Sequence, residues 1–232
     1  MIYITGDTHG ESEVLMRRKP KDNKPLTDKD KMIICGDFGF VFTTRMENGR
    51  YADEYKLDFL EKSYPCELLF VSGNHENFDR LMQYPDVERY KGVVKEIRKN
   101  IFMLKRGEVY EIEGKKFFTF GGAYSIDKAS KRLNNAWWPQ ELPNPEEYRL
   151  ALENLKKHSY TFDYIITHTA PKRAVIQLGK YPDMHEAELS GFLDWIFTDV
   201  KFKRWFFGHW HVDKSLYDGK IIACLENVYE AE

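Results

Sequence analysis

The chain has 232 residues, of which 42% are hydrophobic and 31% charged, and its formal net charge is −2. This composition is typical of a globular protein with a sizeable core, and it argues against a protein that binds nucleic acid through a basic surface. No apolar run approaches the roughly 20 residues that a membrane-spanning helix needs, and the first residues show no signal-peptide pattern.

The 3 cysteines, Cys35, Cys66 and Cys224, are too few and too scattered for a disulfide framework or a cysteine-rich zinc site. Cys35 and Cys224 lie in apolar, strand-like runs, where buried and unreactive thiols are expected. We therefore expect a reducing compartment, with the cytoplasm as the default.

Strands and helices alternate in the first part of the chain. Continuous apolar runs predict buried strands at residues 1–5, 32–35 and 68–71. Helices are predicted over residues 11–18, 52–63 and 77–83, with a charged loop over residues 19–30. The predicted apolar stripe of the helix at 52–63 contains Tyr55, Phe59 and Leu60, with Leu57 outside it.

From residue 92 to residue 122 the hydrophobic period changes to the alternation typical of strands. Residues 113–115 predict a hairpin turn between strands at 109–112 and 116–120. We interpret this stretch as a second sheet rather than a second domain.

The last part of the chain again alternates between the two kinds of element. Asn144 and Glu147 have the spacing of a capping box and predict a helix to about residue 157. Asp183 and Glu186 repeat that spacing before a further predicted helix. Strands are predicted at 163–167 and 204–207, and a hairpin at 218–219. With no linker or internal repeat, the pattern predicts a layered α/β fold and one domain over residues 1–232.

Polar side chains with metal-ligand chemistry follow five of the predicted strands. Loops after the carboxyl ends of parallel strands line the ligand crevice of a sheet, so these side chains are expected to meet in one place. They are Asp7 and His9, Asp37, Asn74 and His75, His168, and His209 and His211.

Each of these clusters has an ordinary explanation when it is taken alone. A Gly-Asp pair after a strand is usually a tight turn, and an Asn-His pair is usually a cap or a loop. Their conjunction indicates function, because five of the 7 histidines fall in these clusters. The other two, His158 and His185, lie at predicted helix ends and are not assigned to the site.

The chemistry of the donors indicates the kind of metal. Carboxylates, imidazoles and an amide oxygen, without a thiolate, suit Mn²⁺, Fe²⁺, Ni²⁺ or Zn²⁺. Seven ligands are too many for one tetrahedral ion, and they suit two divalent ions that share a bridging carboxylate.

Five blocks of this sequence resemble the calcineurin-like metallophosphoesterase superfamily in content and order, including its small bacterial and phage metallophosphatases. The blocks extend over nearly the whole chain and are residues 6–10, 36–37, 73–76, 167–168 and 208–211. The resemblance implies a four-layer αββα sandwich of two mixed β-sheets flanked by helices, with a dinuclear metal centre at the sheet edges.

The resemblance also implies a role for each residue. The first ion would be bound by Asp7, His9 and His211, the second by Asn74, His168 and His209, and both by Asp37. A metal-bridging hydroxide would attack phosphorus, and His75 would protonate the leaving oxygen. Mn²⁺ is the first choice for both ions, with Fe, Ni or Zn as alternatives.

The sequence departs from the protein serine/threonine phosphatase branch of that superfamily. Residues 38–40 are Phe-Gly-Phe, where that branch carries Val-Asp-Arg-Gly, and Ser72 stands in place of an arginine. In that branch the aspartate orients the catalytic histidine and the arginines bind phosphate. Phosphoprotein phosphatase activity is therefore not expected, and the orienting partner of His75 stays open.

The segment at residues 121–127, which continues through Arg132 to residues 137–141, follows a predicted strand, so we expect it to open onto the metal face as a lid or specificity loop. Within it, Arg132 is a candidate phosphate contact, and Trp137 and Trp138 are candidates for stacking on a base or sugar. Packing of these aromatic residues in a small core beneath the loop is an equal alternative.

The leading hypothesis is a hydrolase of phosphate mono- or diesters that acts on a phosphorylated small molecule or nucleotide, with no membrane partner. A nuclease is the first alternative, because the basic stretches at residues 17–31 and 91–106 could contact nucleic acid. Solvated lysines on loops and strand edges explain these stretches better. The second is a non-catalytic scaffold on the same fold. The sequence leaves the oligomeric state open.

Overall fold

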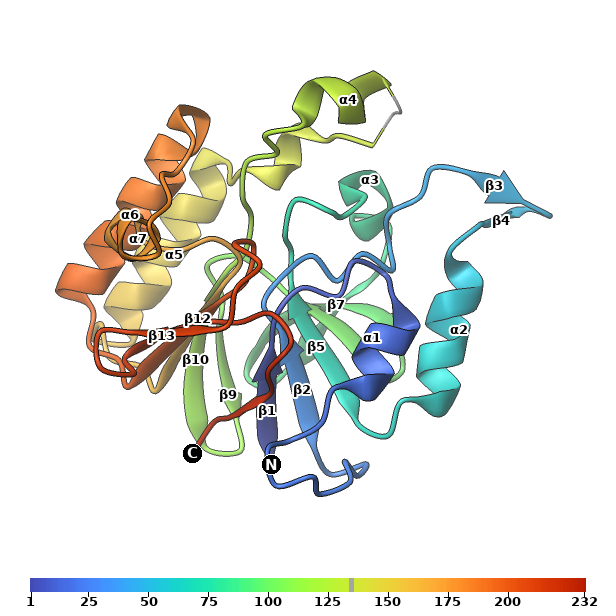
Figure 1. Cartoon of the computed structure of the whole chain (residues 1–232), viewed down its shortest axis with the longest axis horizontal. Coiled ribbons are helices and arrows are strands. Elements are labelled where there is room, and N and C mark those ends of the chain that lie inside the picture. Colours follow the sequence, from blue (N-terminus) through green and yellow to red (C-terminus); the bar gives the residue numbers. More distant parts are fainter. Residues whose placement is uncertain (134–135) are drawn as a thin grey trace.

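The computed structural model describes residues 1–133 and 136–232. Two large mixed sheets pack face to face, and helices cover both outer faces (Figure 1). One face carries α1 (Ser12–Arg17) and α2 (Glu54–Ser63), and the other carries α5 (Pro145–Lys157), α6 (Lys172–Gln177) and α7 (Ala187–Asp199). The predicted four-layer αββα sandwich is confirmed.

The first sheet has seven strands in the order β15-β1-β2-β5-β8-β7-β6. Its centre is parallel, from β1 through β2 and β5 to β8, and the strands beyond are antiparallel to their neighbours. The strands are β1 (Ile2–Thr5), β2 (Lys31–Ile34), β5 (Glu67–Val71), β6 (Asp86–Arg89), β7 (Gly92–Arg98), β8 (Ile101–Leu104) and β15 (Tyr229–Glu230).

The second sheet has six strands in the order β13-β14-β12-β11-β10-β9, with the parallel part running from β10 to β14. The strands are β9 (Val109–Ile112), β10 (Lys115–Phe120), β11 (Tyr164–Thr167), β12 (Arg204–Phe207), β13 (Lys214–Leu216) and β14 (Ile221–Ala223). The remaining elements are short: β3 (Met46–Glu47), β4 (Arg50–Tyr51), α3 (Phe78–Leu81), α4 (Lys128–Leu133) and the 3₁₀ turns η1 (Pro139–Glu141) and η2 (Met184–Glu186).

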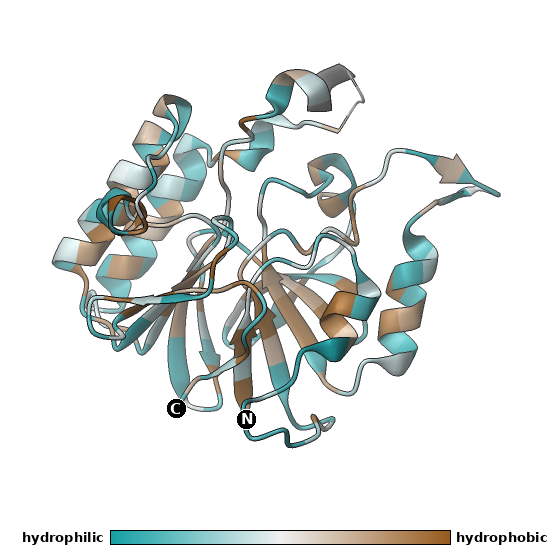
Figure 2. Ribbon diagram, in the orientation of Figure 1, coloured by the Kyte–Doolittle hydropathy of each residue, from teal (hydrophilic) through white to brown (hydrophobic). Residues whose placement is uncertain are grey.

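The central strands are buried on both faces, as their continuous apolar runs predict. Successive side chains of a strand point to opposite faces, so Tyr3, Met32 and Ile34 pack beneath α1 and α2. Ile4 and Ile33 point the other way, into the core between the two sheets. Figure 2 shows the result as hydrophobic central strands beneath helices that are partly hydrophilic.

The β-rich stretch at residues 92–122 does not form one sheet, contrary to the prediction. β7 and β8 join the first sheet, whereas β9 and β10 belong to the second. Tyr110 links the two parts, because its hydroxyl accepts from the Lys105 amide at 2.8 Å and donates to the Val93 carbonyl oxygen at 2.7 Å. Alternation identifies strands, but it does not say which sheet each strand joins.

The apolar stripe predicted for α2 was also wrong. Leu57 and Leu60 are fully buried, whereas Tyr55 is 66% exposed and Phe59 is 45% exposed. Residues three apart share a helix face, and packing on the sheet selected the face with two leucines.

The carboxyl ends of the parallel strands bring the predicted ligand loops together. β1, β2 and β5 are neighbours in the first sheet, and β11 and β12 are neighbours in the second. The two sets of loops meet at one edge of the sandwich. No helix in the described ranges has the length and apolar character that crossing a bilayer requires.

Candidate metal centre

The loops after these five strands place three overlapping groups of ligand atoms, each within 4.8 Å. The groups are Asp7, His9 and His211; His9, Asp37 and His75; and Asp7, Asp37 and His168. Because Asp7, His9 and Asp37 each belong to two groups, the three groups form one cluster.

His168 shows what the cluster requires. Its Nδ1 lies 2.8 Å from the Cys35 carbonyl oxygen, so Nδ1 carries the proton that it donates. Its Nε2 faces Asn74 Oδ1 at 3.1 Å and Asp37 Oδ1 at 3.3 Å. Two acceptor oxygens this close to Nε2 require a positive charge between them, supplied either by a proton on Nε2 or by a metal ion that all three atoms bind. A divalent cation fits this point, because the set combines imidazole, amide and carboxylate.

A second convergence lies around Asp7. The Nε2 atoms of His9 and His211 are 3.1 Å apart, and His211 Nε2 is 3.2 Å from Asp7 Oδ2. Asp7 is buried, whereas the His211 side chain is 57% exposed, so this half of the cluster faces solvent. It fits a cation that substrate can reach.

Asp37 lies between the two convergences. Its Oδ1 accepts hydrogen bonds from the backbone amides of Asn74 and His75, both at 2.8 Å, and its Oδ2 lies 3.9 Å from His9 Nδ1. These amides fix the carboxylate in place, with one oxygen toward His168 and the other toward His9.

His209 is placed less directly. Its backbone amide donates to both carboxylate oxygens of Asp7, at 3.0 and 3.1 Å, and its ring lies 5.0 Å from that of His168. Among the described residues, none of the three compact ligand-atom groups includes a ring nitrogen of His209.

The charges of the cluster are strongly coupled. Burial disfavours the charged imidazole of His168, but the Asp37 carboxylate outweighs burial and raises the pKa of His168 to about 10. Burial opposes ionisation of Asp37 too, yet the neighbouring imidazolium holds the pKa of Asp37 well below its usual range. Burial and the charge of His168 lower the pKa of His209 to about 3, so His209 is neutral, as a metal ligand must be.

Four residues of the cluster have a left-handed backbone conformation. The φ angles are 48° at His9, 45° at Asp37, 63° at His209 and 51° at His211. Non-glycine residues rarely adopt this region, and when they do they concentrate at functional sites. Tight packing of the loops around the ligands explains why these residues are held there.

The ring of His75 lies between two other rings. It is 4.9 Å from the His9 ring in an edge-on arrangement and 5.6 Å from the Phe42 ring. The backbone amides of Phe42 and Thr43 donate to Asp53 Oδ2, both at 2.9 Å. The His75 imidazole thus packs against one aromatic side chain and one further imidazole.

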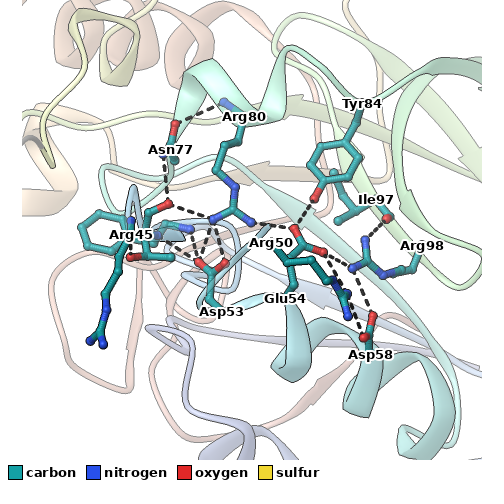
Figure 3. A network of polar contacts seen from close by, with 12 residues as sticks. Arg45, Arg50, Asp53, Glu54, Asp58, Asn77, Arg80, Tyr84, Ile97 and Arg98 are labelled. Carbon is teal, nitrogen blue, oxygen red and sulfur yellow. Dashed lines mark hydrogen bonds and ion pairs between the residues drawn. The ribbon is translucent and has the colours of Figure 1, made fainter. Parts of the chain in front are cut away.

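An ion-pair network holds that part of the site in place (Figure 3). Arg80 donates to both carboxylate oxygens of Asp53, at 2.7 and 2.8 Å, and to the Thr43 carbonyl oxygen at 3.0 Å. Asn77 caps α3 by accepting from the Arg80 amide. The network therefore connects the Phe42 loop to the helix that begins three residues after His75.

A cavity of about 560 Å³ opens onto the cluster. Its floor contains Asp37, His75, His209 and His211, and its walls are formed by Tyr124, Ile126, Asp127, Lys180, Tyr181, Asp183, Glu186 and Trp210. Three of the wall residues come from residues 121–127, the first part of the segment predicted to open onto the metal face, and none of the described residues of its later part lines the cavity.

The two tryptophans predicted to contact substrate do not line this cavity. Trp138 is 7% exposed, with its Nε1 donating to Asp79 at 2.9 Å, and the Trp137 Nε1 donates to Glu141 at 2.8 Å. Neither indole is among the described residues that line the cavity. Arg132 belongs to α4, but its side chain is outside the described residues.

The segment at 180–186 supplies a wall that the sequence did not indicate. Asp183 caps η2 by accepting from the His185 amide at 2.8 Å, so it does not cap α7 directly. Glu186 does not complete a capping box: it accepts from the Tyr124 amide at 2.8 Å and from Thr169 Oγ1 at 2.7 Å. Its local spacing matched a capping box, and only the folded chain brings its partners near.

The two basic stretches differ in exposure: most cations at 17–31 are exposed, whereas those at 91–106 are largely buried or paired. Arg18, Lys95 and Arg106 are each 6% exposed. Several of the other cations form ion pairs, including Lys31 with Glu113, Lys91 with Glu111, Arg98 with Glu54 and Lys105 with Asp86. A groove for nucleic acid needs cations that are free to meet phosphates.

The chain matches a known family and is similar to solved structures. The family model of calcineurin-like phosphoesterases matches residues 1–213. The chain is similar to the phosphopantetheinyl hydrolase of Mycobacterium tuberculosis, at 17% identity and a TM-score of 0.48, over 97% of this chain and 89% of that one. It is also similar to a Staphylococcus aureus protein assigned as a 5'-nucleotidase, at 13% identity and a TM-score of 0.46, over 98% of this chain and 49% of that one. No curated protein sequence matched.

Proposed function

Because the chain belongs to the calcineurin-like phosphoesterase family, and is therefore a metal-dependent phosphoric ester hydrolase, we propose that it hydrolyses a phosphate mono- or diester at a dinuclear centre. The convergence of His168 Nε2, Asn74 Oδ1 and Asp37 Oδ1 carries the proposal, because these buried atoms enclose one positive charge that a divalent cation can supply in place of the His168 proton. Mn²⁺ is our first choice, with Fe, Ni or Zn as alternatives.

In this proposal each half of the cluster holds one ion. The ligands are Asp7, His9 and His211 for the first, Asn74, His168 and His209 for the second, and Asp37 for both. Two bound cations would polarise the phosphoryl group and lower the pKa of a coordinated water toward neutrality. The backbone amides of Asn74 and His75 both donate to Asp37 Oδ1 and so fix the orientation of the carboxylate, in which each oxygen could serve one ion.

His75 supplies the proton in the proposed reaction. A water oxygen forms the new bond to phosphorus, the bond from phosphorus to the alcohol oxygen breaks, and the proton of His75 moves to that oxygen. His75 lines the cavity, and its ring packs against those of His9 and Phe42, which limits its rotation. General acid catalysis of this kind typically contributes about 10²–10⁴-fold.

We propose a phosphorylated small molecule or nucleotide as the substrate, in the cytoplasm. The three free thiols are buried, which suits a reducing compartment. A nuclease ranks behind this proposal because the basic stretch at 91–106 is largely buried or paired and the chain has a formal net charge of −2. A non-catalytic scaffold ranks last, since the expected ligand residues are all present.

The test is hydrolysis of nitrophenyl phosphate and bis-nitrophenyl phosphate with Mn²⁺, together with metal content by elemental analysis. We expect turnover and two ions per chain. Asp37→Asn should lower kcat by more than about 100-fold, beyond the range of groups that only support a metal ligand.

His209→Ala should lose one ion and activity, whereas the matched variant His158→Ala should keep both. His158 is the C-cap of α5, and none of the three ligand-atom groups among the described residues includes it. No turnover with any divalent ion, or wild-type rates in Asp37→Asn, would overturn the proposal.

A further inference from the structure

Two large apolar side chains are exposed at the cavity that opens onto the metal cluster. Ile126 is 85% exposed and Tyr181 is 83% exposed, and both line the cavity. Trp210, between His209 and His211, lines it as well. Apolar surface gathered at a catalytic cavity is a common sign that a ligand covers it.

The loops that carry these side chains are fixed to the metal cluster. Glu186, which is 2% exposed, connects the Tyr124 amide to Thr169, the residue after His168. On the other side, Lys180 Nζ donates to the Trp210 carbonyl oxygen at 2.7 Å. The apolar side chains therefore stand at a defined place relative to the ligands.

The charged side chains of the cavity wall restrict which leaving groups can bind in the cavity. Asp127 and Asp183 contribute carboxylates, and Lys180 is the only lysine or arginine among the described lining residues. An acidic leaving group, such as a second phosphate, would meet these carboxylates. A neutral group with hydroxyls would not be repelled.

We propose that the alcohol released from the phosphate is neutral and carries a planar ring, which lies against Tyr181, Ile126 and Trp210. This inference rests on the proposed function, because the phosphate must sit at the metal cluster. A cavity of about 560 Å³ has room for a phosphate and a ring system of nucleoside size. An aryl alcohol and a nucleoside share this chemistry.

The test compares esters with and without a ring, in the Mn²⁺-loaded protein. The pairs are adenosine 5'-monophosphate with ribose 5-phosphate, and phenyl phosphate with glycerol 3-phosphate. Tyr181→Ala and Ile126→Ser should each raise KM about fivefold for the ring-bearing esters, as expected for loss of an aromatic or apolar contact, with kcat and the other esters unchanged. Preference for adenosine or phenyl identifies the kind of ring.

The chain offers matched controls. Tyr55→Ala, at a residue 66% exposed on α2, and Ile176→Ser, at a residue 48% exposed on α6, remove similar side chains that do not line the cavity. Both should leave every KM unchanged. A similar KM increase in these controls would contradict the inference, as would equal effects of Tyr181→Ala on ring-bearing and ring-free esters.

Calorimetry with phenylphosphonate and methylphosphonate, which are not hydrolysed, separates this inference from the proposed function. Tighter binding of phenylphosphonate that Tyr181→Ala abolishes supports the ring site even if no ester is turned over. Equal affinities overturn the ring site even if turnover is found. The protein could instead form a dimer that Tyr181→Ala dissociates without any change in KM. That result would assign the apolar surface to a second copy of the chain and would also overturn the ring site.

Discussion

At the scale of single residues, close approach of backbone and ligands determines the metal cluster. A Cβ on Gly73 would lie 2.1 Å from Asp37 Oδ1 and 2.8 Å from His168 Nε2. A Cβ on Gly208 would likewise lie 2.1 Å from Asp7 Oδ1. No real Cβ makes such contacts, so these two positions require glycine for a steric reason.

We therefore expect Gly73→Ala to displace the Asp37 carboxylate and to abolish metal binding and turnover. Gly191→Ala is the matched control, because its Cβ would meet no atom within 4 Å in α7. In a helix interior it should stabilise the protein by roughly 0.5–1 kcal/mol. Thermal unfolding and metal content measure both effects. Metal binding retained in Gly73→Ala would contradict the steric argument.

At the scale of elements, charged side chains connect α2 and α3 to the first sheet. Arg80 of α3 pairs with Asp53 and Glu54 at the start of α2, and Arg98 of β7 pairs with Glu54 and Asp58 (Figure 3). The Arg80 side chain is 2% exposed, so its charge depends on these carboxylates rather than on water. The network compensates for the short length of α3, which could not be stable alone.

Arg80→Met should destabilise the fold by about 3–5 kcal/mol, because it leaves the buried Asp53 carboxylate without its cation. Chemical denaturation measures the loss. Arg149→Met, which removes an exposed arginine that pairs only within α5, is the control and should change stability very little. An equal loss of unfolding free energy in the two variants would show that burial of the Arg80 ion pairs does not increase their contribution to stability.

At the scale of the whole molecule, the metal cluster lies where the two sheets meet. Asp7, Asp37 and Asn74 come from loops of the first sheet, and His168 and His211 from loops of the second. Ions bound by both sets would therefore join the two halves of the sandwich.

Metal binding should for this reason stabilise the entire fold. With free Mn²⁺ at a hundred times its dissociation constant, the free energy of unfolding should rise by about 2.7 kcal/mol. The melting temperature of a chain of this size should then rise by roughly 5–10 °C. Scanning calorimetry with Mn²⁺ and with chelator tests this, and an unchanged melting temperature would argue against metal binding by the folded protein.

Local chemistry made several elements predictable. The capping box of Asn144 and Glu147 forms at the start of α5, and the turn at residues 113–114 joins β9 to β10. Both signals depend on residues that are neighbours in sequence, so they do not depend on how distant parts of the chain pack. The capping box predicted from the spacing of Asp183 and Glu186 does not form. The Glu186 carboxylate accepts hydrogen bonds from Tyr124 and Thr169 instead, which are distant in sequence.

The sequence by itself determined which residues could serve as metal ligands and at which strand ends they stand, since apolar runs and strand-end motifs are local properties. Only the tertiary structure decided how β7 to β10 divide between the two sheets. It also placed Ile126 and Tyr181 beside the metal cluster. An exposed side chain on a loop has no periodicity, so only the packing of distant elements places it. The local pattern thus supplies the chemistry, and packing supplies the surroundings that a substrate meets.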